Sequence, residues 1–297
     1  MEQNVIGSMY KSMADRGLSK QKVNTSDYYE NGLLMCGLCH TNKQILVKPP
    51  KEIGLKEFVA SVDCECEQKK KQRIKEEEER EKREKRIREL KQDGLDKIAQ
   101  ESTFDKFLKT QENSRNFKIS QRYVDKFEEL RKENQGLIFW GPVGTGKSFL
   151  AACIANKLIE NGYVVIMTSF IQVINTLRTD SDSADELLRK IRTAHLVIFD
   201  DFGTERCTDF ALETIYSLID YRYRNKRPII LTTNMTYTQL QEEKDSRYMR
   251  IYDRVCAICY PLEFTGSSWR RAMTKDKYQD TEKSLLEQGE GNSQCAG

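Results

Sequence analysis

The stretch that decides the fold is GPVGTGKS, residues Gly141–Ser148, which directly follows the apolar segment Leu137–Trp140. It fits the pattern G-x-x-x-x-G-K-[ST], in which a glycine-rich loop connects a buried strand to a helix. The next residues, Ser148–Glu160, repeat apolar side chains at helical spacing. The sequence therefore predicts a strand, a phosphate-binding loop and a helix, in that order.

Such a loop suits the phosphates of ATP. Glycines let backbone N–H groups approach the phosphates, and the helix N-terminus adds the positive end of its dipole. We expect Lys147 to reach the β- and γ-phosphates and the Ser148 hydroxyl to bind Mg²⁺. A glycine-rich turn without a ligand is the alternative, and the strand and helix on either side weigh against it. The predicted ATP-binding residues are Gly141, Pro142, Val143, Gly144, Thr145, Gly146, Lys147, Ser148 and Phe149.

Short apolar runs, each bounded by polar residues or glycine, recur after the loop. They lie at Tyr163–Thr168, Leu196–Asp200 and Pro228–Thr233. Helical patterns separate them, at Phe170–Leu177, Ser183–Arg192 (with Ser183 and Glu186 as a capping box) and Thr208–Tyr223. Strands that alternate with helices predict an α/β fold, with a parallel sheet flanked by helices.

Polar side chains end two of the predicted strands. Asp200 and Asp201 close the run LVIFDD, and Asn234 closes IILTTN. Ligands of open α/β sheets bind at the carboxyl ends of strands. We therefore expect Asp200 to face the Mg²⁺ beside Ser148 and Asp201 to polarise the attacking water. Asn234 is expected to orient that water or to contact the γ-phosphate, and the alternative is that it caps the next helix.

Four of the nine cysteines form two close pairs, Cys36/Cys39 and Cys64/Cys66. Two such pairs about two dozen residues apart predict a structural Zn²⁺ site with four thiolate ligands. The second pair has the unusually tight spacing C-x-C, so His40 is an alternative ligand. Four free thiols are the remaining alternative.

A third pair, Cys256/Cys259, lies in the apolar run Val255–Tyr260 with no further pair nearby. Because buried cysteines are common, we expect these two to be core residues of a strand.

Composition excludes several classes of protein. Charged residues make up 32% of the 297 residues, but the net charge is only +3, which does not mark the whole chain as a nucleic-acid binder. No apolar run has membrane-spanning length, and the N-terminus lacks the layout of a signal peptide. We expect a cytoplasmic protein with no membrane partner.

Residues 100–272 resemble the AAA+ ATPases, and specifically the bacterial and phage replicative helicase loaders of the DnaC/DnaI type (the DnaC/IstB-like ATPase family). The resemblance depends on GPVGTGKSFLAACIANKL, LVIFDDFGTE, IDYRYRNKRPIILTTN and GSSWRR. It implies an AAA+ ATPase domain that assembles through its ATP interfaces. It also implies single-stranded DNA and a hexameric replicative helicase as partners, with the zinc module holding the helicase.

The resemblance also implies roles for individual residues. Arg254, in YDRV, is similar to the arginine finger that reaches the γ-phosphate of a neighbouring subunit, and Arg270 is similar to the second sensor. Their competitors are Arg247, Arg250 and Arg271. Thr103–Phe104 resembles the segment near the nucleotide base. Asp201 stands where related ATPases have a longer glutamate, which predicts slow hydrolysis.

The segment Phe170–Arg178 occupies the place of a DNA-contacting helix in initiator-like ATPases. There, Phe170 would stack on a base and Arg178 would meet a phosphate. The alternative is an amphipathic core helix that buries Ile171, Ile174 and Leu177, which we favour for these three residues.

Together these features predict a zinc-binding helicase-interaction module over residues 1–66, a charged linker over 67–99, an AAA+ domain over 100–273 and a polar tail over 274–297. Acids four residues before bases, as in Glu76–Arg80, favour a helical linker, and a disordered linker is equally compatible. The predicted function is ATP-dependent delivery of a hexameric replicative helicase onto single-stranded DNA. The alternatives are a transposition ATPase of the IstB type, a non-hydrolysing ATP-binding adaptor and a zinc-based DNA-binding regulator.

Overall fold

The computed structural model describes residues 23–179, 181–203, 208–242 and 245–269, together with residues 274, 278, 281, 282 and 285. The chain divides into two compact units, Met1–Glu84 and Lys85–Gly297, and the boundary falls inside the long helix α2 (Glu65–Gly94). Among the described helices, none combines the length and the apolar character that crossing a bilayer requires.

The first unit contains two small antiparallel sheets. Its elements are β1 (Tyr28–Glu30) paired with β2 (Leu33–Met35), β3 (Gln44–Val47) paired with β4 (Phe58–Ser61), and the short 3₁₀ helix η1 (Lys51–Ile53). Its few buried apolar side chains include Leu34, Met35 and Ala60, next to Cys36 and Cys64. A core this small needs an additional staple to be stable.

Most of the charged run predicted as a linker, residues 67–99, is helical, because α2 extends to Gly94. Ion pairs four residues apart join Glu65 to Lys69, Lys75 to Glu79, Arg80 to Glu84 and Lys85 to Glu89. Three of these four pairs place the base first, which is the opposite of the order that the sequence favoured. All are well exposed, so each contributes only a few tenths of a kcal/mol, roughly 0.3–0.5 for such helix pairs.

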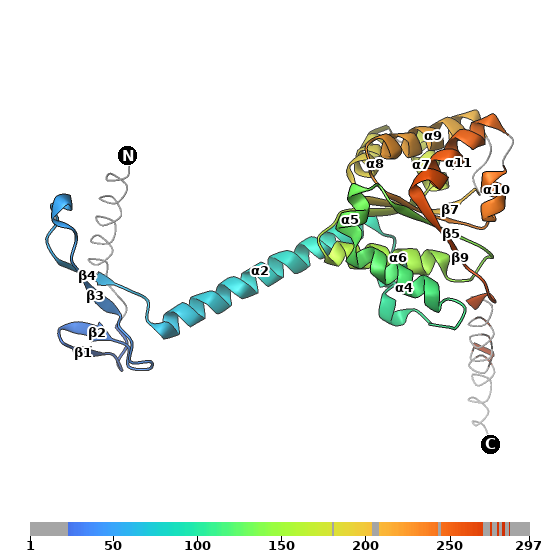
Figure 1. Ribbon diagram of the computed structural model, residues 1–297. Coiled ribbons are helices and arrows are strands. Elements are labelled where there is room, and N and C mark those ends of the chain that lie inside the picture. The colour runs from blue at the N-terminus through green and yellow to red at the C-terminus, as the bar shows by residue number, and fades with distance from the viewer. Residues whose placement is uncertain are drawn as a thin grey trace, which may run out of the picture. The chain divides into compact units, whose positions relative to one another are not determined.

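The second unit is built on a five-stranded parallel sheet in the order β6-β7-β8-β5-β9. This confirms the predicted fold class (Figure 1). The strands are β5 (Gly136–Trp140), β6 (Val165–Ser169), β7 (Leu196–Phe202), β8 (Ile229–Thr233) and β9 (Cys259–Glu263).

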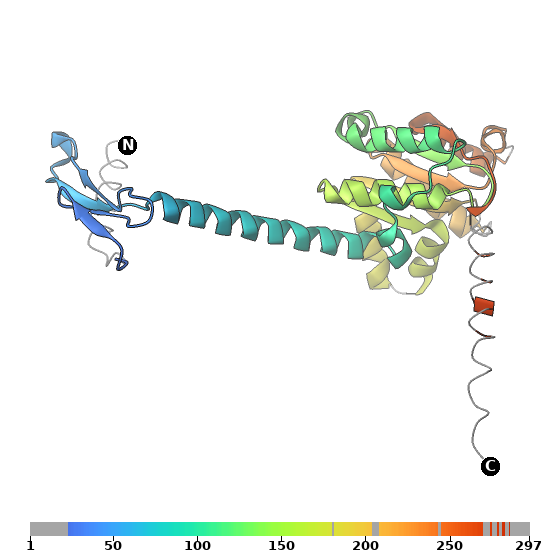
Figure 2. The same cartoon turned by 90° about the horizontal axis from the view of Figure 1, so that it is seen from below.

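Helices cover both faces of this sheet. One face carries α3 (Lys97–Glu101), η2 (Phe104–Lys106), α4 (Ser114–Asp125), α5 (Phe127–Lys132) and α6 (Lys147–Glu160). The other carries α7 (Phe170–Thr179), α8 (Ser181–Thr193), α9 (Asp209–Arg224), α10 (Tyr237–Gln241) and α11 (Ser246–Ile258). Figure 2 shows the green α4 and the yellow-green α6 on the same side of the sheet.

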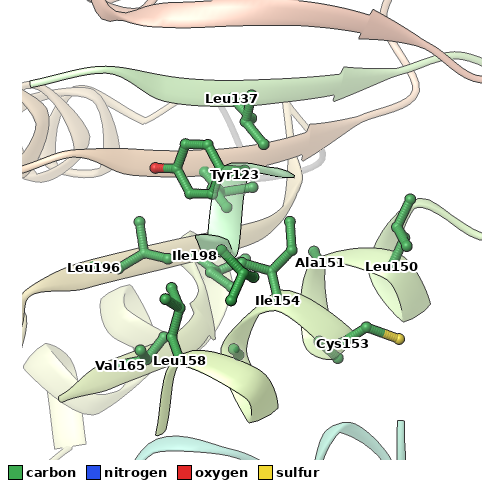
Figure 3. Packing of buried hydrophobic residues seen from close by; sticks show 14 of the residues in the cluster. Tyr123, Leu137, Leu150, Ala151, Cys153, Ile154, Leu158, Val165, Leu196 and Ile198 are labelled. Atoms are coloured by element: carbon green, nitrogen blue, oxygen red, sulfur yellow. The ribbon is translucent and has the colours of Figure 1, made fainter. Parts of the chain in front are cut away.

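The helix that follows the phosphate-binding loop is buried against the sheet. Figure 3 shows Ile154 and Leu158 of α6 turned toward Leu196 and Ile198 of β7, and all four side chains are fully buried. Burying a side chain of this size stabilises the fold by about 1.5–3 kcal/mol. The loop at the start of α6 is therefore anchored by one of the most buried helices of the domain.

Two sequence-based predictions about elements are wrong. α8 begins at Ser181, so Ser183 lies inside the helix and does not cap it. The run 255–260 is not one strand, because α11 ends at Ile258 and β9 begins at Cys259. Short apolar runs fit a helix end and a buried strand equally well, which is why periodicity did not separate them. Cys259 is buried in the core, as expected, whereas Cys256 on α11 is only half-buried.

A fully buried cation ties the amino-terminal ends of β7 and β8 together. The guanidinium of Arg222 on α9 donates to the carbonyl oxygens of Ile191 (2.6 Å), Ala194 (3.2 Å) and Pro228 (2.7 Å). Arg222 belongs to the segment IDYRYRNKRPIILTTN, so part of that pattern has a structural explanation.

Replacing Arg222 with methionine should destabilise the second unit by about 3 kcal/mol or more, because several buried carbonyl groups lose their donors. Urea unfolding followed by circular dichroism measures the change. The matched control is Arg224→Met in the same helix, where the lost ion pair to Asp220 involves an exposed arginine. The control should change stability by less than about 1 kcal/mol. Equal losses in both variants would contradict this account.

Candidate functional site

The carboxyl ends of β7, β8 and β5 lie side by side because these strands are parallel neighbours. A cavity of about 420 Å³ lies at this edge, which is within the range of small-molecule sites, roughly 300–1,000 Å³. The predicted site residues that line it are Val143, Gly144, Gly146, Lys147, Ser148, Phe149, Asp200, Asp201 and Asn234. These residues lie at or just after the carboxyl ends of three strands. The structure thus brings together side chains up to 91 positions apart in the sequence, from Val143 to Asn234.

The shape of the loop depends on two glycines that lie against the segment following β9. A Cβ atom on Gly141 would collide with the carbonyl oxygen of Phe264, and one on Gly144 would collide with the Ser268 hydroxyl. Two backbone hydrogen bonds hold this segment in place, from Phe264 N–H to Trp140 O (2.8 Å) and from Trp269 N–H to Gly144 O (2.9 Å). The glycines therefore allow close packing behind the loop as well as access in front of it.

Three predicted loop residues, Gly141, Pro142 and Thr145, are not part of the cavity lining. The buried Thr145 donates its hydroxyl proton to the carbonyl oxygen of Pro142 over 2.9 Å. This bond closes the loop over three residues.

Lys147 is buried at the start of α6, and only 5% of it is exposed. Its ammonium group donates to Gly141 O (2.7 Å), Pro142 O (2.8 Å) and Asn234 Oδ1 (2.9 Å). A buried ammonium needs several acceptors. Phosphate oxygens can take the place of these neutral acceptors, so the residues present fit a bound triphosphate.

Asp200 and Asp201 both line the cavity. β7 continues to Phe202, two residues beyond the end of the predicted run Leu196–Asp200. The strand is irregular here. Its register with β8 shifts between Phe199 and Phe202, and Asp201 has a φ of 55°. Aspartate is one of the few residue types that tolerate this left-handed conformation. The two carboxylates line the same cavity as the Ser148 hydroxyl, and carboxylate and hydroxyl oxygens are the donors that Mg²⁺ prefers.

Asn234 is not a helix cap. The N-cap of α10 is Thr236, whose hydroxyl accepts from the Gln239 N–H in a complete capping box. Asn234 lies just after β8 with its Oδ1 on the Lys147 ammonium group. This geometry excludes the capping alternative and links β8 to the loop.

Part of the cavity lining is apolar, and most of these residues were not predicted from the sequence. Ile98, Phe107, Leu108, Met167 and Trp269 form this part. Their positions follow no periodic pattern, so only the proximity of Trp269 to the predicted Arg270 could have indicated one of them.

Thr103 and Phe104, which were predicted to lie near the nucleotide base, are not part of the cavity lining, although Ser102 before them is. Phe104 packs edge-to-face on Phe117 with ring centroids 5.5 Å apart, within the core cluster, while Phe107 and Leu108 line the cavity. A 3₁₀ turn over 104–106 separates the two positions.

Arg254 lies on α11 and is absent from the cavity lining. It donates to Asp220 Oδ1 (2.6 Å) and the Tyr216 hydroxyl (2.9 Å). Burial alone would lower the pKa of Arg254, but the ion pair with Asp220 raises it. Its competitors differ, since Arg247 pairs with Asp209 and Asp245 and Arg250 is exposed. The predicted Arg270 and its competitor Arg271 lie outside the described residues.

α7 does not present Phe170 for base stacking. Phe170 is buried and stacks on Phe199 with ring centroids 4.1 Å apart. Ile174 is buried as expected, but Ile171 is exposed, so its predicted place in the core is wrong. The buried stripe of this helix therefore starts one residue earlier than the pattern indicated.

The four predicted zinc ligands come together in the first unit. The sulfur atoms of Cys36, Cys39, Cys64 and Cys66 all lie within 4.8 Å of one another. Tetrahedral thiolate sites with zinc–sulfur bonds of about 2.3 Å place sulfurs about 3.8 Å apart, so this set fits a Zn²⁺ ion after a small contraction. His40 lies outside this group and faces Tyr28, with its Nδ1 3.2 Å from the tyrosine hydroxyl.

The surroundings of the thiols favour charge on one of them. The Thr41 hydroxyl, 3.0 Å from the Cys39 sulfur, lowers the pKa of Cys39 to about 5. Hydrogen bonding and charge from Cys39 in turn raise the pKa of Cys66 to about 12. Four close thiols cannot all ionise without a cation, which is the condition that a bound metal satisfies.

The turn that carries the first cysteine pair is fixed by Asp27. Its carboxylate accepts from the Gly37 N–H (3.2 Å) and pairs with the ammonium group of Lys43 (2.7 Å), and both charged side chains are buried. Gly37 must be glycine here, because a Cβ atom would collide with the Ser26 backbone.

A family model described as IstB-like ATP binding protein matches residues 60–277, which is more than half of the 297-residue chain. The chain belongs to this family. This IstB-like chain is 30% identical over 144 residues to the phage-like element PBSX protein XkdC of Bacillus subtilis, covering 46% of this chain and 54% of XkdC.

Two helicase loaders are similar to this IstB-like chain. It is 26% identical over 161 residues to the replicative helicase loader DnaI of Bacillus subtilis (50% of this chain, 51% of DnaI). It is 26% identical over 193 residues to the replicative helicase loader DnaC of Escherichia coli K12 (62% and 76%). The matched region spans about half the length of XkdC and DnaI.

A crystal structure of DnaI aligns with a TM-score of 0.51 at 23% identity, covering 59% of this chain and 93% of that one. At this identity the likeness supports the fold alone. The family match and this likeness in fold agree on an IstB-like ATP-binding chain with a parallel α/β sheet.

Substitution of a single cluster cysteine, Cys64→Ser, should abolish zinc binding, because three thiolates and a hydroxyl form a much weaker site. Metal analysis of the purified chain should find about one zinc ion per chain in the wild type. The matched control is Cys256→Ser, a half-buried cysteine outside the cluster, which should keep its zinc. A metal-free wild-type chain that retains its folded N-terminal unit would contradict the assignment.

Proposed function

We propose that this chain is an ATP-dependent helicase loader, which binds a hexameric replicative helicase and delivers it onto single-stranded DNA. The main support is the cavity at the edge of the sheet, where Lys147, Ser148, Asp200, Asp201 and Asn234 meet. The relatives named replicative helicase loaders, DnaI and DnaC, supply the biological context.

In this proposal, ATP binding exchanges the partners of Lys147. The ammonium group leaves the carbonyl oxygens of Gly141 and Pro142 for the β- and γ-phosphates, and the loop N–H groups take the β-phosphate. Ser148 and Asp200 would hold Mg²⁺, which neutralises charge on the phosphates when bound. Asp201 accepts a hydrogen bond from the attacking water and orients it, and Asn234 holds Lys147 from the side of β8.

Assembly would add groups from a second copy of the chain. Arg254 does not line the cavity of its own chain, so a contact with ATP requires a neighbouring subunit's cavity. Its present partner Asp220 would have to release it, and the negative charge of a γ-phosphate is a suitable replacement. We place the four-cysteine module at the helicase and keep single-stranded DNA as the second partner.

A second candidate is an ATPase that works with a transposase. The observation in its favour is the family model itself, whose description names IstB. Purification of the full chain from its host separates the two functions, because the loader should bring down a hexameric helicase and the transposition ATPase a transposase.

Replacing Lys147 with alanine should leave helicase capture unchanged and abolish ATP-dependent transfer to DNA, because the phosphates lose their buried cation. A pull-down of the host's replicative helicase, followed by a strand-unwinding assay on single-stranded DNA circles, measures both steps with ATP and with ADP. Normal delivery by the variant would rule out an ATP-gated mechanism.

The matched control is Lys157→Ala. Lys157 lies on the same helix, but it is exposed and pairs with Glu160 at the far end of the helix from the loop. This variant should load helicase at the wild-type rate.

Replacing Asp201 with asparagine should lower the hydrolysis rate by about 100-fold or more while ATP binding stays within a few-fold of wild type. Asparagine tolerates the left-handed backbone at this position as well as aspartate does, so the variant removes the charge and keeps the fold. Phosphate release and equilibrium binding of a fluorescent ATP analogue measure the two effects. Wild-type hydrolysis by this variant would remove Asp201 from the mechanism.

A further inference from the structure

A buried threonine on β8 touches both acidic residues of the candidate site. The Thr232 hydroxyl donates its proton to Asp200 Oδ1 over 2.5 Å and accepts the backbone N–H of Asp201 over 2.9 Å. Thr232 is fully buried, so no water competes for these bonds. One hydroxyl group therefore uses its donor and an acceptor position on two consecutive acids of the neighbouring strand.

These two bonds lie where the ladder between β7 and β8 is interrupted. The register shifts between Phe199 and Phe202, so Asp200 and Asp201 lie outside the regular pairing of β7 with β8. At the same place Asp201 adopts its positive φ. The Thr232 side chain thus replaces a missing ladder contact with a hydrogen bond to the Asp201 N–H.

The next two residues make separate contacts. The Thr233 hydroxyl donates to Phe202 O over 2.7 Å and accepts the Met235 N–H over 3.1 Å, so it bonds to backbone groups. Asn234, just after β8, accepts from the Lys147 ammonium group over 2.9 Å. Of the three, only Thr232 bonds to a carboxylate of the site.

We propose that Thr232 is a positioning residue for ATP hydrolysis, one that fixes the orientation of the Asp200 carboxylate and the backbone of Asp201. This inference depends on the proposed ATPase function. With Oδ1 of Asp200 bonded to the hydroxyl, the other carboxylate oxygen would be the one that holds Mg²⁺. Because the Asp201 N–H donates to Thr232, the backbone from which the Asp201 side chain extends toward the cavity keeps a fixed position. Neither effect requires Thr232 to touch the nucleotide.

The test uses two substitutions of Thr232 in the full chain. Thr232→Val keeps the shape and removes the hydroxyl, and Thr232→Ser keeps the hydroxyl. We expect Val to lower the hydrolysis rate about ten- to hundredfold, a loss typical of misplaced catalytic groups. We expect it also to raise severalfold the Mg²⁺ concentration that half-saturates binding of a non-hydrolysable ATP analogue. Without Mg²⁺, binding of the analogue should stay within about twofold of wild type, and Ser should restore hydrolysis and the Mg²⁺ requirement.

Thr233→Val is the matched control. It is the same substitution at the next, equally buried position, and it removes a hydrogen bond to a backbone carbonyl rather than to a carboxylate. It should lower the melting temperature about as much as Thr232→Val, yet keep hydrolysis and the Mg²⁺ requirement near wild type.

Three results would overturn the proposal: wild-type hydrolysis and Mg²⁺ requirement in Thr232→Val, equal losses in the two valine variants, or no rescue by serine in a folded variant. A wild-type chain that does not hydrolyse ATP at all would instead refute the proposed function. In that case the Mg²⁺ requirement of analogue binding still decides the role of Thr232.

Discussion

The parallel pairing of β8 with both β5 and β7 is the constraint on which the candidate site depends. The pairing aligns Trp140 of β5 with Thr233 of β8, and Phe202 of β7 with the same residue. The phosphate-binding loop, the two aspartates and Asn234 each begin within a few residues of this line, so they lie close enough for the Lys147 side chain to connect the loop to Asn234. A shift of one strand by two residues would move its polar group by about 6.6 Å, beyond hydrogen-bonding reach of the others.

The same sheet buries a cation at each end, and the partners of the two cations explain their different roles. Arg222, at the amino-terminal ends of β7 and β8, donates to backbone carbonyl groups whose positions are fixed by the fold. Lys147, near the carboxyl end of β5, donates to two carbonyl groups of the loop and to the Asn234 side chain. Removing Arg222 from its partners would leave helix and strand ends unsatisfied, whereas the loop and the side chain around Lys147 can exchange with a ligand. Burial of a positive charge alone therefore does not identify a ligand site, and the nature of the acceptors does.

The part of the fold that the sequence could predict is the part built from local patterns. The strands of the sheet up to β8, the loop and α6 follow from apolar runs and from one motif. The end of α11 and the start of the edge strand β9 could not be predicted, because their boundary at Cys259 lies inside one continuous apolar run. The place of Phe107 and Trp269 in the cavity lining could not be predicted for a different reason. They belong to segments that pack on the loop only in the folded chain.

The two sets of candidate metal ligands show the same division at atomic scale. The first cysteine pair lies in a turn whose hydrogen bonds, from His40 N–H to Cys36 O and from Gly37 N–H to Asp27, join residues at most ten positions apart, and its spacing could be recognised in the sequence. Asp200 is held by Thr232, which lies 32 positions away and reaches it only after two strands pair. Motif searches find the ligands in both cases, but they find the supporting residue only where it is a neighbour in the chain. In a site assembled from several strands, the residues that orient the ligands are thus the ones that the structure adds.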